Sequence, residues 1–386
     1  MVSHGLLISL GTLFLVGLIA DQLSRKAWVP RVTLLLLFGI VVGSSGFDLI
    51  PQQLSGLYSM LSAVALTMVA FLLGGALKFE TLREHGAAIL LISLSIVIAT
   101  VFVVTTGLYF LGLPFGLALL LATIATATAP AATNDVIRHS GIENGFTRTL
   151  GGIVAIDDAW GLIAFSLGVV FVTQMTDTST DIGVLHAFKE IGAAILLGAM
   201  IGVPAAVLTG RLSGGEPLET EALGLVFLTA GLAVWLELSF LIAGMVAGAI
   251  IVNFASHHRR AFHEIEHIQW PFMVLFFILA GASLEIDTVV GLGGVGLAFV
   301  ALRVGSRLFG GWVGGALAGV PRKERLMFGW ALLPQAGVAI GMALVAAQQF
   351  PQWEPQIMAL TIGSTVIFEI IGPIASLVAI RKSARE

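Results

Sequence analysis

Charge and cysteine are both scarce in this chain. Only 11% of its 386 residues are charged, and it contains no cysteine. A soluble globular domain carries about 25% charged residues, so this chain lacks the polar groups to cover a water-facing surface. The absence of cysteine excludes disulfides and thiolate metal sites. No loop is long enough for a soluble domain, so we expect any nucleotide-binding or regulatory module to be another polypeptide.

Apolar runs long enough to cross a bilayer recur along the whole sequence, in which 57% of the residues are hydrophobic. We therefore predict an all-α polytopic membrane protein with about 13 transmembrane helices. The predicted spans are centred near Leu13, Leu37, Leu66, Val97, Ala125, Asp158, Leu197, Thr229, Val246, Phe277, Leu302, Val338 and Phe368.

Apart from Lys189, the basic residues of the predicted loops lie in alternate loops. The positive-inside rule makes these loops cytoplasmic, with the N-terminus outside, the C-terminus inside and an odd number of spans. The segment Met1–Asp21 has no positively charged start, so we expect a retained first helix rather than a signal peptide. The opposite loops carry acids, with Lys189 as their only base. The basic set is Arg25, Lys26, Arg31, Lys78, Arg83, Arg138, Arg148, Arg211, Arg259, Arg260, Arg322, Lys323, Arg325, Arg381, Lys382 and Arg385.

Five ionisable residues fall inside predicted spans: Asp157, Asp158, Arg303, Arg307 and Glu369. An unpaired Asp or Arg at the centre of a membrane helix costs about 2.5–3.5 kcal/mol on insertion scales. Such residues therefore pair with one another or line a wet cavity, and they commonly mark an ion or proton path.

Asp157 and Asp158 are adjacent, so on a helix they point about 100° apart and cannot perform the same task. Burial and a neighbouring like charge both favour the protonated form of a carboxyl group. A carboxyl that holds a proton near neutral pH can exchange it for a metal cation, which is the simplest chemistry for antiport. A salt bridge between helices, or a hydrogen-bonded carboxylic acid, is the structural alternative.

Arg303 and Arg307 lie four residues apart and share one helix face. Arginine stays protonated when buried, so we expect an aspartate of the pair to be its counter-ion. For Arg303, snorkelling to the cytoplasmic end of the helix is an equal alternative. Glu369 suits a structural role, bonding an arginine or freed backbone groups, at least as well as ion contact.

Two spans contain a proline where a helix is expected to break. Pro130 has no N–H and forces Ala129 out of helical geometry, and Pro334 interrupts a later span. The pair Asp157–Asp158 follows the first break by one span, and Glu369 follows the second by one span. An odd number of spans separates the two units, so the layout predicts inverted repeats with two crossing discontinuous helices. Beside the first break we expect Thr126, Thr128 and Asn134 to help Asp157 and Asp158 bind the ion, and Thr133 offers a further oxygen there.

With these motifs the chain resembles the monovalent cation:proton antiporter superfamily along essentially its whole length. Ala155-Ile-Asp-Asp-Ala-Trp-Gly161 is similar to the paired-aspartate helix of bacterial sodium/proton antiporters, and Thr128-Ala-Pro130 resembles their unwound stretch. Gly75-Ala-Leu-Lys-Phe-Glu80 resembles the motif that closes the third span, and Arg307-Leu-Phe-Gly310 resembles the helix facing the aspartates.

The resemblance implies that Asp158 binds the cation or proton and that Asp157 pairs with Arg307. It implies a homodimer in a bacterial inner membrane, with a mobile core (86–173 and 288–380) and a dimerisation or scaffold part (1–55 and 185–255). We expect sodium and protons as the transported ions and no resident cofactor. We expect the protein to contact membrane lipid and not to bind nucleic acid. Many members have a lysine where this chain has Arg307, so we hypothesise electroneutral exchange.

Other functions remain open at this stage. They are potassium/proton antiport, sodium-coupled carriage of an organic anion on the same fold, a channel, and an intramembrane aspartyl protease, whose acids would lie on separate helices. One predicted cytoplasmic loop is rich in histidine and is either an ordinary solvated loop or a pH sensor. It contains His257, His258, His263 and His267 with Arg259 and Arg260.

Overall fold

The computed structural model describes residues 4–27, 31–77, 86–176, 184–208, 217–255, 258–284, 288, 291–335 and 337–384, and within them the chain is helical apart from short connections. All thirteen predicted span centres fall on these helices or, for Ala125, at the junction of two of them, which confirms the predicted all-α polytopic fold. The helices are α1 (His4–Ala27), α2 (Arg31–Val42), α3 (Gln52–Ala76), α5 (Gly86–Phe110), α6 (Phe115–Ile124), α7 (Pro130–Ser140), α8 (Gly145–Thr176), α9 (Val184–Leu208), α10 (Pro217–Trp235), α11 (Phe240–Phe254), α12 (His258–Ala282), α14 (Gly293–Leu317), α15 (Arg322–Ala331), α16 (Gly337–Gln349), the 3-10 turn η1 (Pro351–Trp353) and α17 (Glu354–Ala384).

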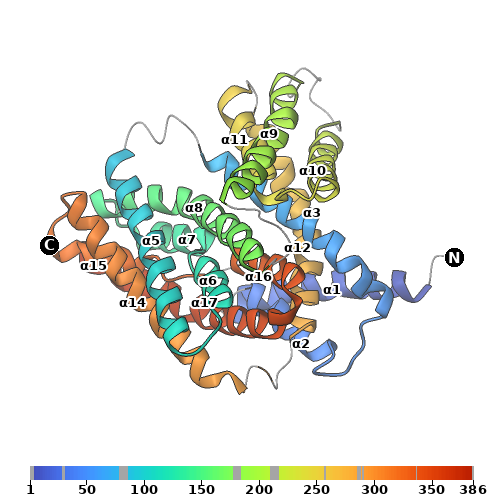
Figure 1. The fold of residues 1–386 in the computed structure, drawn as a ribbon, viewed down its shortest axis with the longest axis horizontal. Helices are drawn as coiled ribbons and strands as arrows, with labels where there is room; N and C mark the ends of the chain where they lie inside the picture. Colours follow the sequence, from blue (N-terminus) through green and yellow to red (C-terminus); the bar gives the residue numbers. More distant parts are fainter. Residues whose placement is uncertain are drawn as a thin grey trace.

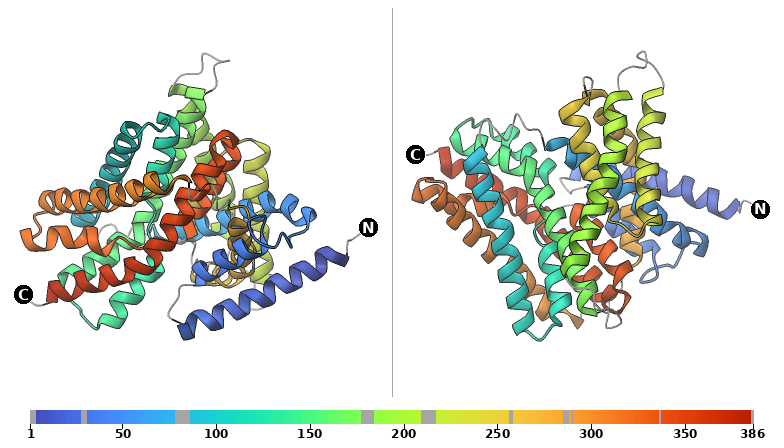
Figure 2. Two further views of the ribbon diagram at one scale, coloured as in Figure 1. Left: turned by 90° about the horizontal axis from the view of Figure 1, so that it is seen from below. Right: turned by 45° about the horizontal axis from the view of Figure 1, so that its top comes forward.

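The helices form two groups that lie side by side (Figures 1 and 2). The first group, which we call the core, holds α5–α8 and α14–α17 and includes the C-terminal end of the chain. The second group, which we call the scaffold, holds α1–α3 and α9–α12, with α11 packed on α3 and α9, and α12 packed on α2 and α3. The long helix α8 also touches α3, α9 and α11, so it forms much of the boundary between the groups.

The core is built twice from the same series of elements. α5 and α14 are each 25 residues long, and α6 and α15 are each 10 residues long. Each short helix is followed by a break, then by a second short helix, and then by a helix of more than 30 residues, α8 or α17. The two copies start from opposite predicted sides of the membrane, as the charge pattern of the loops requires.

Helix lengths match this arrangement. A 25-residue helix is about 37 Å long and crosses a hydrocarbon layer of about 30 Å, whereas a 10-residue helix reaches only about halfway. The breaks after α6 and α15 therefore lie deep in the membrane. Backbone groups freed at that depth need partners from within the protein, because lipid offers none.

The two copies meet where α5 packs along α14. Gly310 and Gly314 of α14 lie directly against the backbone of Ile96 and Ile92 of α5, where an added Cβ at Gly310 would stand 2.6 Å from the Cα of Ile96. Small residues allow this close approach of membrane helices, in which van der Waals packing replaces the hydrophobic effect. This contact holds Arg307 and Arg303, which lie one and two turns before Gly310 on α14, against the breaks.

Candidate functional site

The first break contains the unwound stretch that the sequence predicts. α6 ends at Ile124 and α7 begins at Pro130, so proline takes the first helical position, where its missing N–H costs nothing. Ala129 has φ −122° and ψ 86°, outside helical geometry, as expected for a residue before proline. The carbonyls of residues 125–127 and the N–H of Thr128 are thereby released from helical hydrogen bonding.

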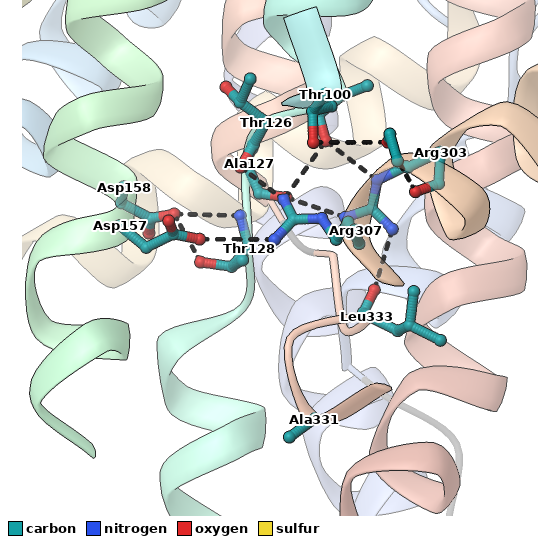
Figure 3. A network of polar contacts seen from close by, with 12 residues as sticks. Thr100, Thr126, Ala127, Thr128, Asp157, Asp158, Arg303, Arg307, Ala331 and Leu333 are labelled. Atoms are coloured by element: carbon teal, nitrogen blue, oxygen red, sulfur yellow. Dashed lines mark hydrogen bonds and ion pairs between the residues drawn. The ribbon is translucent and has the colours of Figure 1, made fainter. Parts of the chain in front are cut away.

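Asp158 takes up the released N–H. Its Oδ1 accepts from the backbone nitrogen of Thr128 at 3.1 Å and from the Thr128 hydroxyl at 3.0 Å (Figure 3). Only 1% of Asp158 is exposed, and its Oδ2 has no hydrogen-bond partner in the part of the chain that the structure describes. One oxygen is thus fixed by the break, and the second is left to bind another species.

Asp157 has a different partner, on α14, although Figure 3 shows its carboxylate beside that of Asp158, with both directed from α8 toward the first break. Its Oδ2 lies 3.4 Å from Nη1 of Arg307, and both side chains are fully buried (Figure 3). Nη2 of the same guanidinium donates to the carbonyl of Thr126 at 2.5 Å, and to those of Ala125 and Ala127 at 3.3 and 3.2 Å. Arg307 therefore ties the aspartate helix to the broken helix.

Arg303 differs from expectation, because among the described residues it has no carboxylate partner and its side chain does not reach the protein surface. It is completely buried and donates to the carbonyls of Ala125, Ala127 and Leu333 at 3.0, 2.9 and 2.9 Å (Figure 3). The last carbonyls of a helix carry partial negative charge, so two helix ends together replace a counter-ion. Arg303 thus joins the first break to the second.

The second break lies between Ala331 and Gly337, around Pro334. The helix α17 closes it from one side: the Ser376 hydroxyl donates to the carbonyl of Ala331 at 2.7 Å, and Gly372 packs against Pro334. Gly161 lies against Thr126 at the first break in the same way. In each copy, a glycine on the long helix thus permits that helix to approach its break.

Glu369 is buried on α17 without an arginine partner among the described residues. The hydroxyl of Thr33 on α2 donates to its carboxyl group, and the guanidinium of Arg303 instead stands over the neighbouring Phe368 ring, 4.1 Å from its centroid. The expectation that Glu369 compensates a charge is therefore not what the contacts show: it joins the core to the scaffold.

The oxygen-bearing residues beside the first break occupy different positions. Thr128 reaches Asp158, whereas the Thr126 hydroxyl donates to the carbonyl of Thr123 at 2.5 Å and closes the end of α6. Asn134 is exposed on α7, away from the aspartates, and Thr133 is the buried member of that turn. The side chains of the histidine group, and the end of the Gly75–Glu80 motif from Lys78 onward, lie outside the described residues.

Several contributors to the site carry no sequence signal that we recognised. Thr33 and Ser376 lie far along the chain from the residues they bond, and the carbonyls that hold the arginines belong to alanine, threonine and leucine. Gly161 and Gly372 each follow a membrane carboxylate by three residues. This repeated spacing could have predicted that each long helix approaches its break closely.

Two hollows lie along α8 at the boundary between core and scaffold. An apolar hollow of about 360 Å³ is lined by Ile156, Trp160 and residues of α3, α5 and α11. A hollow of about 820 Å³ is lined by the segment from Phe165 to Thr173, by Lys189 and Glu237, and by part of α16. The aspartate pair lies on α8 between the second hollow and the N-terminal end of that helix, which is predicted to be cytoplasmic.

A buried carboxylate pair and an arginine between two discontinuous helices, inside a duplicated core, define a secondary transporter. The family model described as "Sodium/hydrogen exchanger, transmembrane" matches residues 10–380. The chain belongs to this family: it is a membrane antiporter that exchanges a cation for protons, and not an enzyme.

Related proteins match most of the chain at low identity. It is 22% identical over 351 residues to the ammonium/H⁺ antiporter subunit AmhT of Alkalihalophilus pseudofirmus, covering 88% of this chain and 86% of that protein. It is 22% identical over 303 residues to the probable Na⁺/H⁺ antiporter 2 of Methanocaldococcus jannaschii, covering 72% of this chain and 69% of that protein. The solved structure of the sodium proton antiporter MjNhaP1 from the same organism has the same fold, with a TM-score of 0.77 at 17% identity over 98% of this chain and 97% of that one.

Proposed function

We propose that this protein exchanges sodium for protons by alternating access, with the two ions competing for Asp158. The observation that carries the proposal is the unequal pair of oxygens on Asp158. Thr128 holds Oδ1, while Oδ2 is buried with no partner among the described residues. Sodium is a hard cation that prefers oxygen ligands. A proton on Asp158 neutralises it, and sodium does the same, so each ion displaces the other.

Asp157 has a different task in this proposal. Its contact with Arg307 at 3.4 Å keeps a negative charge beside a positive one, so the pair adds no net charge to the site. Arg307 also holds three carbonyls of the first break, which fixes the position of Thr128 relative to Asp158. Asp157 and Arg307 therefore organise the site, and Asp158 binds the transported ion.

Removal of the Asp158 charge tests the site. We expect Asp158→Asn to abolish sodium-dependent proton release from lipid vesicles, because asparagine cannot alternate between a proton and a cation. The matched control is Asp135→Asn, which neutralises an exposed acid on the neighbouring helix α7 and is expected to leave exchange unchanged. Undiminished exchange in Asp158→Asn would overturn the assignment.

We further propose one proton per cation, and hence electroneutral exchange. Arginine does not release its proton in proteins, so Arg307 cannot supply a second one. An imposed membrane voltage should then leave the sodium gradient at equilibrium unchanged. For one net charge per cycle, 100 mV is worth about 2.3 kcal/mol, which would shift that gradient about 50-fold. We expect Arg307→Lys, whose ammonium can release a proton, to acquire voltage dependence.

The cation is a separate question that flux assays decide. Sodium is favoured by the names of two relatives, whereas AmhT is named for ammonium. The two are the probable Na⁺/H⁺ antiporter 2 of Methanocaldococcus jannaschii and the Na⁺/H⁺ antiporter ApNhaP of Aphanothece halophytica. Potassium/proton exchange is the second candidate among the alkali cations. Vesicles loaded at fixed pH and challenged in turn with sodium, lithium, potassium and ammonium will rank the ions. A larger proton efflux with ammonium than with sodium would replace sodium as the cargo.

We propose a homodimer whose scaffold stays fixed while the core moves against it in a bacterial inner membrane. The two hollows along α8 support movement at this boundary, because helices there are not packed continuously. The proposed division into a core of 86–173 and 288–380 and a scaffold of 1–55 and 185–255 is supported by the two helix groups of Figure 1, although the scaffold group also contains α12 and the rest of α3. Single cysteines introduced into α1 or α10, in a chain with none of its own, will report dimer contacts by cross-linking.

A further inference from the structure

Glu369 is a buried carboxyl group that the proposed exchange at Asp158 does not use. It lies midway along α17, 7% exposed, and accepts a hydrogen bond from the hydroxyl of Thr33 on α2. Thr33 is itself 2% exposed. The contact joins two segments that are more than 300 residues apart and belong to different helix groups.

No cation neutralises Glu369 among the described residues. Arg303 of α14 donates to three backbone carbonyls at the breaks. Arg31 on α2 forms an ion pair with Asp21 at 2.8 Å. Asp157, Asp158 and Arg307 are engaged with one another and with the first break. The other charged residues on helices packed against α17 form no ion pair with Glu369 within the described part of the chain. These residues are Asp135, Arg138 and His139 of α7, Arg148 of α8, and Arg322, Lys323, Glu324 and Arg325 of α15. An ionised carboxylate without a partner is too costly to bury, so Glu369 carries its proton in this arrangement.

Glu369 also holds the place in the second copy of the core that Asp158 holds in the first. Each lies on the long helix after a break, three residues before the glycine that packs on that break. The difference lies in the partner. Asp158 is bonded by Thr128 of its own copy, whereas Glu369 is bonded by a residue of the scaffold.

α2 is attached firmly to the scaffold. Gly39 and Gly43 lie directly against the backbone of α12 near Ala282, and Gly281 of α12 lies against Leu36 in return. A movement of the core against the scaffold would therefore carry Glu369 away from Thr33, while the hydrogen bonds of Asp158 would travel with the core.

We propose that Glu369 is a second proton-binding site, which holds its proton while α17 is docked on Thr33 and releases it to water when the core moves away. The inference rests on the proposed movement of the core. Thr33 lies half a turn from Arg31, at the predicted cytoplasmic end of α2, so the proton exchanges with the cytoplasmic side. The same side takes and returns this proton, so it leaves the ratio of transported ions unchanged. Cytoplasmic acid then favours the docked state, and alkali favours its release.

Infrared difference spectroscopy on the full chain in lipid vesicles tests the protonation directly. In an Asp158→Asn background, a shift from acid to alkaline pH should remove the carbonyl stretch of a protonated carboxylic acid, and adding Glu369→Gln should eliminate that signal. A signal that is unchanged by Glu369→Gln would overturn the proposal. Because this measurement needs no sodium exchange, it stands or falls independently of the proposed function.

Transport provides the second measurement. Glu369→Gln is permanently neutral, so we expect exchange to lose most of its activation between acid and alkaline cytoplasmic pH. Thr33→Val should move that activation to lower pH, and Thr33→Ser, which keeps the hydroxyl, should restore the wild-type profile. Profiles identical to wild type in both Glu369→Gln and Thr33→Val would also overturn the proposal.

The contact itself can be locked. The chain contains no cysteine, so Thr33→Cys with Glu369→Cys introduces the only pair able to form a disulfide. We expect oxidation to stop exchange and reduction to restore the rate of the reduced double variant. Each single cysteine variant controls for oxidation alone. Continued exchange with the disulfide in place would show that the core does not leave Thr33 during transport.

Discussion

Arg303 is the residue whose replacement most directly tests how the two breaks are held together. Arg303→Met keeps an unbranched stem in place of the first part of the arginine side chain and removes every donor. Three carbonyls, of Ala125, Ala127 and Leu333, would lose partners that now lie 2.9–3.0 Å away. The guanidinium would also leave the face of Phe368, where it now stands 4.1 Å from the ring centroid.

The expected cost follows from these contacts. The carbonyl of Leu333 would lose its side-chain donor, at a cost of about 1–3 kcal/mol. The carbonyls of Ala125 and Ala127 would keep their longer bonds from Arg307 at 3.3 and 3.2 Å, so each loses about 0.5–1.5 kcal/mol and the sum is roughly 2–6 kcal/mol. Removing a buried charge returns several kcal/mol of desolvation energy, which places the net loss near the lower end of that range. We therefore expect Arg303→Met to destabilise the protein by about 2 kcal/mol. Arg303→Lys keeps the charge but has a compact head that cannot span both breaks, so its loss should be intermediate.

Thermal and denaturant unfolding of purified protein in one detergent will measure the difference. Arg325→Met is the matched control, because Arg325 is half-buried and its Nε donates to a single carbonyl, that of Val320 at 2.8 Å. We expect it to cost about 1 kcal/mol. If Arg303→Met is no less stable than Arg325→Met, the breaks do not depend on this arginine and the reasoning is wrong.

Two further predictions concern the site and its packing. Thr128→Val removes one hydroxyl bond to Asp158 worth about 1 kcal/mol, so the apparent affinity for sodium should fall about fivefold in vesicle flux assays, and Thr128→Ser should recover it. Gly310→Ala places a Cβ 2.6 Å from the Cα of Ile96 and should lower the free energy of unfolding in detergent by about 1–3 kcal/mol. The control is Gly305→Ala, whose Cβ meets no atom within 4 Å and should leave stability unchanged. Equal stability of the two variants would contradict the packing argument.

The architecture could be predicted from the sequence because a bilayer imposes simple requirements. Every span needs an apolar run of a certain length, and basic residues mark one side, so helix number, order and duplication are readable one segment at a time. The two breaks were readable for the same reason, because Pro130 and Pro334 each remove a backbone donor locally. The adjacency of Asp157 and Asp158 predicted that they have different tasks, and the two carboxylates contact different partners, Arg307 and Thr128.

The partners of the buried charges were decided by the tertiary structure alone. Arg303 binds helix-end carbonyls of two different copies of the core, and a carbonyl acceptor exists at every residue, so no sequence pattern distinguishes these three. Glu369 meets Thr33 because α17 and α2 come together across the boundary between core and scaffold. A charged residue inside a predicted membrane helix indicates that a partner must exist. Which of many chemically equal groups becomes that partner depends on which helices pack together.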